Sequence, residues 1–264
     1  MDANTRNELK ALLRAREWSQ QMRINVSNRM EIKKDGSRMK SFGSVMLDDE
    51  SIPYMIAMKE ACNSNEEMIE KKITSIVKQD RMWKEFFSTI PGIGPMGAAY
   101  LLAEIDIEKA STRARIWQFC GLNSGMILGK KVKANGEIEV TGELVRGDRK
   151  TAGFKCPYNS WLKPKLYGVI AKGMILASGR SSRPNKYYKI YLDRKNRTSQ
   201  SEACVGDSEK KWKDEPNAHI DMDAQRFMLK QMLSDFYETY RAQEGLEVRV
   251  RYEEEYLGRK HHAD

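Results

Sequence analysis

The sequence predicts a mainly α-helical domain that contains a helix-hairpin-helix motif and one small β-hairpin insertion. Most segments place apolar residues three or four apart, which is the helical period. A Pro-Gly-Ile-Gly run at 91–94 interrupts this pattern. An Asn-Gly pair at 135–136 lies inside an alternating segment, 131–140, and this combination is typical of a two-stranded hairpin. At 264 residues, 40% of them hydrophobic, we expect the chain to bury one good core.

The first 80 residues are expected to form an N-terminal helical region. Residues 5–24 have the spacing of an amphipathic helix, and a Lys-Asp-Gly turn predicts a loop over 32–49. A run of helices should follow, broken near 62–65. Ser64 and Glu67 have the spacing of a capping box, which would begin the second of these helices.

Three further regions are predicted after residue 80. Residues 81–200 hold the helix-hairpin-helix motif, a short helix at 113–120, the β-hairpin, and two helices that begin near Pro157 and Pro184. Residues 201–217 are polar and predict a linker. Residues 218–258 predict a long helix, 219–244, that ends at Gly245 and is followed by a tail.

Positive charge is concentrated in one part of the chain. The formal net charge is +9, but residues 111–200 carry 19 Lys or Arg against 5 Asp or Glu, a local net charge of +14. The rest of the chain is mildly acidic. Concentrated positive charge on such a frame attracts a phosphate backbone, although a solvated basic face without a partner has the same composition.

The Pro-Gly-Ile-Gly run is suited to binding an anion. Gly92 and Gly94 allow close approach of a ligand to the backbone, and Pro95 starts the next helix without the loss of a hydrogen bond. Free N–H groups and the helix dipole favour an anion there, which in nucleic-acid proteins is a backbone phosphate. A simple connector between helices is the other interpretation. The candidate DNA-binding residues of the motif are Gly92, Ile93, Gly94, Met96 and Gly97.

Basic side chains downstream are expected to extend this contact. The candidates are Lys130, Lys131, Lys133, Arg146, Arg149, Lys150, Lys163 and Lys165. A second surface would combine cations with tyrosines that can stack on unpaired bases, namely Lys186, Lys189, Arg194 and Lys195 with Tyr187, Tyr188 and Tyr191. Core packing at helical spacing explains these tyrosines equally well.

Two enzymatic chemistries find little support in the residues. A helix-hairpin-helix DNA glycosylase with lyase activity needs a lysine two residues after the second glycine, where this chain has Met96, and a downstream Asp, which is missing between Asp106 and Asp148. For a metal site, only His219 and Asp223 could share a helix face. We therefore expect no metal centre and no cofactor. Mg²⁺ would enter only if a partner supplied an acidic site.

Other features indicate a protein of a reducing compartment, and we expect it in the cytoplasm without membrane contact. The four cysteines are far apart and form no Cys-x-x-Cys pair. The longest apolar run, 166–179, is too short to cross a bilayer, and the first residues lack a signal-peptide pattern.

Two blocks of sequence carry a family resemblance. The first is Ile-Pro-Gly-Ile-Gly-Pro at 90–95 with Ala-Ala at 98–99 and Leu-Leu-Ala-Glu-Ile at 101–105. The second is Trp-Gln-Phe-Cys-Gly-Leu at 117–122. In these blocks the chain resembles the C-terminal region of the insertion-sequence-110 family of transposases (the 110/116/902 group). A looser similarity includes 158–163, 187–191 and Arg226–Lys230, so that it covers about 83–258.

The resemblance implies DNA recombination, but this chain departs from the family. Full-length members carry an N-terminal RuvC-like domain whose four acidic residues bind metal, a serine that attacks DNA, and a structured RNA guide. Here the first 80 residues predict helices, so that we expect this catalytic half to be absent. The serine would fall on Ser124, where the spacing is shorter than in the family and no base is identifiable nearby. A turn into the β-hairpin is the favoured interpretation of Ser124 and Gly125.

These observations leave three functions open. The leading one is a transposase-related protein that binds the DNA backbone during transposition of a mobile element. The second is cleavage or exchange of DNA strands by Ser124, with a partner protein supplying the acidic domain. The third is binding of structured RNA or assembly with a partner, and the oligomeric state stays open.

Overall fold

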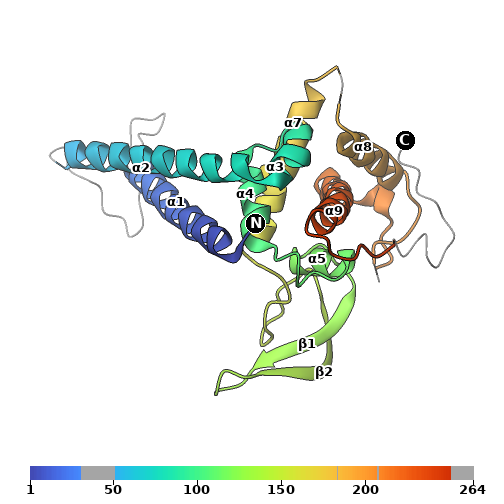
Figure 1. Cartoon of the computed structure of the whole chain (residues 1–264). Coiled ribbons are helices and arrows are strands. Elements are labelled where there is room, and N and C mark those ends of the chain that lie inside the picture. The colour runs from blue at the N-terminus through green and yellow to red at the C-terminus, as the bar shows by residue number, and fades with distance from the viewer. Residues whose placement is uncertain (31–50, 183, 207, 251–264) are drawn as a thin grey trace.

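The computed structural model describes residues 1–30, 51–182, 184–206 and 208–250. Over these ranges the protein is mainly α-helical with one two-stranded antiparallel β-hairpin, which confirms the predicted class. Figure 1 shows a helical body from which a long helical pair and the β-hairpin project in different directions. The loop predicted at 32–49 and the end of the C-terminal tail lie outside the described residues.

Helices α1 (Ala3–Met30) and α2 (Ile52–Gln79) form the projecting pair (Figure 1). The predicted break near 62–65 is wrong, because α2 runs through it without interruption. Tertiary packing overrides the local capping signal there. Glu66 is buried against α1, where the Nε of Arg23 donates to it at 2.6 Å, and the neighbouring Cys62 is buried as well.

The Pro-Gly-Ile-Gly turn lies between short helical segments and rests on another helix. It follows α3 (Arg81–Glu85) and a 3₁₀ turn (Phe87–Thr89), and it leads into α4 (Pro95–Glu104). Gly92 has φ +94°, and a Cβ atom there would lie 2.3 Å from the carbonyl oxygen of Gly173. A Cβ atom on Gly173 would lie 2.3 Å from the oxygen of Gly92. The two backbones therefore touch where only glycines fit.

Gly173 belongs to a helical stretch that begins later than the sequence predicts. The stretch comprises α6 (Leu162–Lys165), a π-helical segment (Leu166–Ala171) and α7 (Lys172–Gly179). The helix expected from Pro157 starts at Leu162 because the side chain of Asn159 accepts the N–H groups of Trp161 and Leu162. The π segment is one turn of wider hydrogen bonding within an otherwise α-helical run.

Helix α9 (Asn217–Gln243) is the centre of the hydrophobic core. Met228, Met232 and Phe236 on it are fully buried, and the ring of Phe236 packs on Phe87 at a centroid distance of 5.6 Å. The helices α8 (Lys186–Ser199) and α5 (Arg113–Phe119) pack against it. One core cluster includes residues from α1 to α9, so that the long C-terminal helix shares its core with the segments before the linker.

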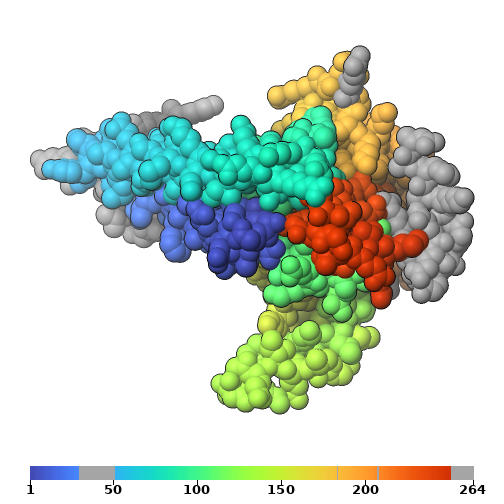
Figure 2. Space-filling view, viewed as in Figure 1, coloured from blue at the N-terminus to red at the C-terminus, as the bar shows by residue number. Residues whose placement is uncertain are grey.

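The β-hairpin consists of β1 (Met126–Val132) and β2 (Ile138–Arg146), which pair in antiparallel register with an irregularity beside Gly129. The Asn-Gly turn is confirmed, with Gly136 at φ +85°. The hairpin extends away from the helical body (Figure 2), and most of its residues are exposed. After α8, residues 201–216 contain a β-bridge between Cys204 and Lys211 and a 3₁₀ turn at Trp212–Asp214.

The contact between the two glycines can be tested by mutation. Gly92→Ala should lower the free energy of unfolding by about 2–4 kcal/mol, because the new Cβ overlaps the Gly173 backbone and the positive φ disfavours a side chain. The change is measured by urea unfolding followed by circular dichroism. Gly94→Asn is the matched control and should leave stability within about 0.5 kcal/mol. Equal effects of the two substitutions would contradict the assignment.

Candidate nucleic-acid interface

Gly94 lies at the start of α4 on an open surface. Its backbone is extended, with φ −82° and ψ 174°, which any residue can adopt. A Cβ atom there would have no neighbour within 4 Å. Neither conformation nor packing therefore requires a glycine at this position. Gly92 in contrast approaches the backbone of α7, so that the two glycines of the turn face different surroundings.

The first turn of α4 leaves two backbone donors without an acceptor. Its earliest described backbone bond runs from the N–H of Ala98 to the carbonyl of Gly94, at 3.1 Å. Within the described chain, the N–H groups of Met96 and Gly97 donate to no carbonyl. Such groups and the helix dipole favour a negative charge.

The remaining candidates of the motif have packing roles. Ile93 is buried in the core, and Met96 is half-buried against it. Gly97 is also buried, and a Cβ atom there would lie 3.4 Å from Ile93 and 3.5 Å from Ile170. A Cβ atom at 97 would therefore make ordinary van der Waals contacts, so that the packing of α4 on the π-helical segment does not require a glycine here.

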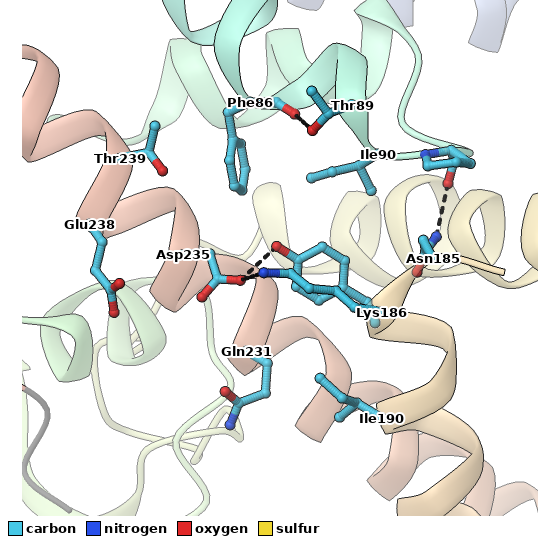
Figure 3. Close-up of a pocket in the computed structure, with 12 residues that line it drawn as sticks. Phe86, Thr89, Ile90, Asn185, Lys186, Ile190, Gln231, Asp235, Glu238 and Thr239 are labelled. Atoms are coloured by element: carbon cyan, nitrogen blue, oxygen red, sulfur yellow. Dashed lines mark hydrogen bonds and ion pairs between the residues drawn. The ribbon is translucent and has the colours of Figure 1, made fainter. Parts of the chain in front are cut away.

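A cavity of about 780 Å³, lined by both apolar and polar side chains, adjoins the turn on the side of α8 and α9. In Figure 3, Lys186 reaches toward Asp235, which accepts from its ammonium at 2.7 Å. The hydroxyl of Tyr187 donates to the same carboxylate at 2.8 Å. Asn185, which caps the start of α8, donates its side-chain N–H to the carbonyl of Pro91 at 3.2 Å. The turn is thus held by α7 through Gly173 and by α8 through Asn185.

Most of the predicted basic residues already have acidic partners inside the protein. The sequence analysis gave twelve basic candidates, eight for the first surface and four for the second. Seven of these twelve form ion pairs with carboxylates: Lys131, Lys133, Arg146, Lys165, Lys186, Arg194 and Lys195. Some of these carboxylates are well buried, such as Asp223 at 4% side-chain exposure. Others are exposed, such as Glu143 at 62%. The local net charge of +14 is therefore partly neutralised by acids from α1, α9 and the hairpin itself.

Four of the twelve are exposed and have no ion pair within the part of the chain that the structure describes: Lys130, Arg149, Lys150 and Lys189. Lys130 is on β1, and Arg149 and Lys150 follow β2, so that three of the four lie in or directly beside the hairpin. Lys155 lies beside them, because its backbone N–H donates to the carbonyl of Lys130 at 2.7 Å. Lys189 is on α8.

The three tyrosines are divided between core and surface. Tyr187 and Tyr191 are buried, and their hydroxyls donate to Asp235 and Asp221. Tyr188 is half-buried and stacks on Tyr191 at a centroid distance of 5.9 Å. This arrangement favours core packing over stacking on bases for Tyr187 and Tyr191.

Ser124 lies at the open end of the hairpin ladder. The N–H of Gly147 donates to the carbonyl of Gly125, so that Ser124 and Asp148 continue the two strands at this end. Burial raises the pKa of Asp148, but its hydrogen bond with Arg146 and the charges of Arg146, Lys163 and Arg226 hold that pKa below the ordinary value. A carboxylate with a lowered pKa is a weak base. Ser124 has no hydrogen-bonded base among the described residues.

The described ranges contain no group of three or more His, Cys, Asp or Glu arranged to hold a metal. His219 pairs with Glu215, and Asp223 accepts from Arg194 and Arg226. None of the described helices combines the length and the apolar character that a membrane span needs.

Two cations near Asp148 were not among the basic residues that the charge pattern predicted to bind DNA. Arg226 and Lys230 lie one turn apart on α9, and Arg226 approaches Asp148 at 3.8 Å. Their segment appeared in the sequence only as part of a family resemblance. Only the tertiary structure identifies them, because α9 brings them to the end of the hairpin at Asp148, which we call the foot of the hairpin.

Residues 84–142, from α3 into β2, match the family model described as Transposase IS116/IS110/IS902 family. The match includes the Pro-Gly-Ile-Gly turn and confirms, over these residues, the resemblance inferred from the sequence. It supports a transposase-related role for the chain in transposition. No curated protein and no solved structure matches the chain.

The environment of Asp148 predicts a pH dependence. Because its pKa is lower in the folded protein than the ordinary value of about 3.9, the carboxylate contributes stability that is present above about pH 5. That stability is lost as the pH falls through the folded-state pKa. Asp148→Asn should therefore cost about 1–3 kcal/mol at pH 7 and less at pH 3.

The measurement is urea unfolding of both proteins between pH 3 and pH 7. A stability difference that stays constant over this range would contradict the role of the charge. Glu143→Gln is the control, because Glu143 is an exposed carboxylate on the same hairpin, and it should change stability by less than about 1 kcal/mol.

Proposed function

We propose that this protein binds the DNA backbone through the start of α4 and the cations at the hairpin, as part of the transposition of a mobile element. The observation that carries the proposal is the contrast between Gly92 and Gly94. Gly92 is required by the fold, whereas Gly94 leaves open space beside two free N–H groups. Close approach of a phosphate to the backbone explains a glycine there.

The unpaired cations extend this contact. Lys130, Arg149, Lys150 and Lys155 lie in the hairpin or after it and have no ion pair among the described residues, so that they can neutralise phosphates. Exposed pairs such as Lys131 with Glu143 cost little to break, because surface salt bridges contribute at most about 1 kcal/mol. A phosphate can therefore replace these carboxylates. Cations held by buried acids, such as Arg194 by Asp223, are expected to stay in place.

The match with a transposase family supports DNA as the partner. Single-stranded DNA and structured RNA are the competing ligands, and cleavage through Ser124 is the competing activity. Location in the cytoplasm stays a prediction. One assay separates these functions: binding of labelled duplex DNA, single-stranded DNA and structured RNA at two salt concentrations, with and without Mg²⁺, followed by a denaturing gel.

Gly94→Asn should weaken the binding of duplex DNA about tenfold or more on every sequence while the protein stays fully folded. Asparagine is a good N-cap residue, so that its side chain would accept the free N–H groups that we assign to phosphate. Fluorescence anisotropy with duplexes of unrelated sequence measures the affinity. Unchanged affinity would exclude the start of α4 as a contact.

Arg149→Gln with Lys150→Gln should reduce the slope of log K against log[salt] by about 1.8, since each lost phosphate contact removes about 0.9. The double variant Lys71→Gln with Lys78→Gln is the control, because these exposed lysines lie on α2, away from the hairpin. An equal change in both double variants would indicate unspecific charge attraction instead of a defined surface.

A further inference from the structure

We propose that Arg226, Lys230 and Lys163 form a binding site for one phosphate group at the foot of the β-hairpin. The site is separate from the start of α4. It rests on the proposed function only for the source of the phosphate, which we assign to the DNA backbone.

Two helices, α6 and α9, bring these cations together. Arg226 and Lys230 are four residues apart on α9 and therefore lie on one face of it. Lys163 comes from α6 and donates to the carbonyl of Asp148 at 2.5 Å. Arg226 reaches the carboxylate of the same Asp148 at 3.8 Å. Asp148, the second residue after β2, is thus a common neighbour of cations from α6 and α9.

The positive charges at this place outnumber the negative ones. Asp148 already holds Arg146, and Asp223 holds both Arg194 and Arg226. Lys163 and Lys230 add two ammonium groups, and neither has a carboxylate within ion-pair distance in the described ranges. Five cations therefore surround two carboxylates. The excess of positive charge calls for an anion.

The ammonium of Lys230 is a charged group without a hydrogen-bond acceptor among the described residues. It lies over the ring of Trp117, 5.0 Å from the centroid. Burial lowers the pKa of Lys230, and Arg226 lowers it further against the attraction of Asp223. Burial also lowers the pKa of Lys163, with Asp148 opposing and Arg226 adding to the effect. Arg226 is the cation that repels both lysines.

The geometry suits an oxyanion better than a carboxylate of the protein. The indole N–H of Trp117 donates to the backbone carbonyl of Lys230 at 3.1 Å, which fixes the ring beneath the ammonium. Asp223 holds the guanidinium of Arg226, whose side chain is still 24% exposed. The cations are therefore held in place before a ligand arrives, and solvent reaches them. Preorganised cations bind a phosphate with little cost in side-chain entropy.

The chain around the site indicates that the phosphate belongs to DNA. Arg149 and Lys150, which have no ion pair in the described chain, directly follow Asp148. A strand bound at Arg226 and Lys230 would meet these cations next. Free inorganic phosphate would bind the same three cations but would gain nothing from Arg149 and Lys150.

The first test uses inorganic phosphate on the whole protein. The side-chain signals of Lys230 and Lys163 are followed by nuclear magnetic resonance against pH, at constant ionic strength, in phosphate and in chloride. Phosphate should raise the pKa of Lys230 toward its ordinary value and leave that of Lys71, an exposed lysine on α2, unchanged. No difference between phosphate and chloride for Lys230, or an equal change in Lys71, would overturn the site.

The second test identifies the source. Lys230→Met keeps the apolar stem over Trp117 and removes only the charge, and it should weaken binding of duplex DNA about tenfold and reduce the salt slope by about 1. Lys230→Arg should retain most of the binding, whereas Lys71→Met should bind like the wild type. If Lys230→Met binds DNA normally while inorganic phosphate still raises the pKa of Lys230, the site serves a free phosphate, and the assignment to DNA is overturned.

The two proposals fail in different ways. Absence of DNA binding by the wild type would overturn the proposed function, while the phosphate titration of Lys230 would stand by itself. Normal DNA binding by the wild type and by Lys230→Met, with no response to inorganic phosphate, would overturn the site alone.

Discussion

The contact between the backbones of Gly92 and Gly173 determines how the turn before α4 is placed. A Cβ atom added to either glycine would lie only 2.3 Å from the carbonyl oxygen of the other. The close approach is therefore possible only because neither residue has a side chain. This approach fixes the turn on α7, and Asn185 holds it from α8. The start of α4 then faces outward with Gly94 on its open side. A turn that is rigid on one side and exposed on the other is suited to bind a phosphate without rearrangement.

Electrostatic pairing decides which part of a basic sequence acts as a basic surface. Acids from distant segments neutralise many of the cations, as Asp223 does for Arg194 and Glu17 does for Lys165. Among the twelve predicted basic residues, those without an ion pair in the described ranges lie mainly in the hairpin, directly after it and at its foot. Because buried carboxylates hold their partners firmly and exposed ones do not, the effective surface is smaller than the sequence suggests and has defined borders.

The two candidate phosphate contacts lie on elements that share one core. Helix α9 packs on α5 and α8 and contributes Arg226 and Lys230 at the foot of the hairpin. The same helix lines the cavity beside the Pro-Gly-Ile-Gly turn through Gln231 and Asp235. The start of α4 and the foot of the hairpin are therefore held in a fixed relation by packed side chains.

Local residue order alone determined the helical class, the Asn-Gly hairpin and the turn at 91–94, because each depends on periodicity or on the backbone freedom of glycine. The family resemblance over 84–142 was likewise readable from the chain. Tertiary structure decided the rest. It made α2 continuous across 62–65 through the pairing of Arg23 with Glu66, and it buried Tyr187 and Tyr191. It also gave the two glycines different surroundings, since Gly92 packs on the Gly173 backbone and Gly94 is exposed. Finally, it placed Arg226 beside Asp148, which is far from it in sequence. Such contacts depend on which distant surfaces meet, and a linear pattern does not record that.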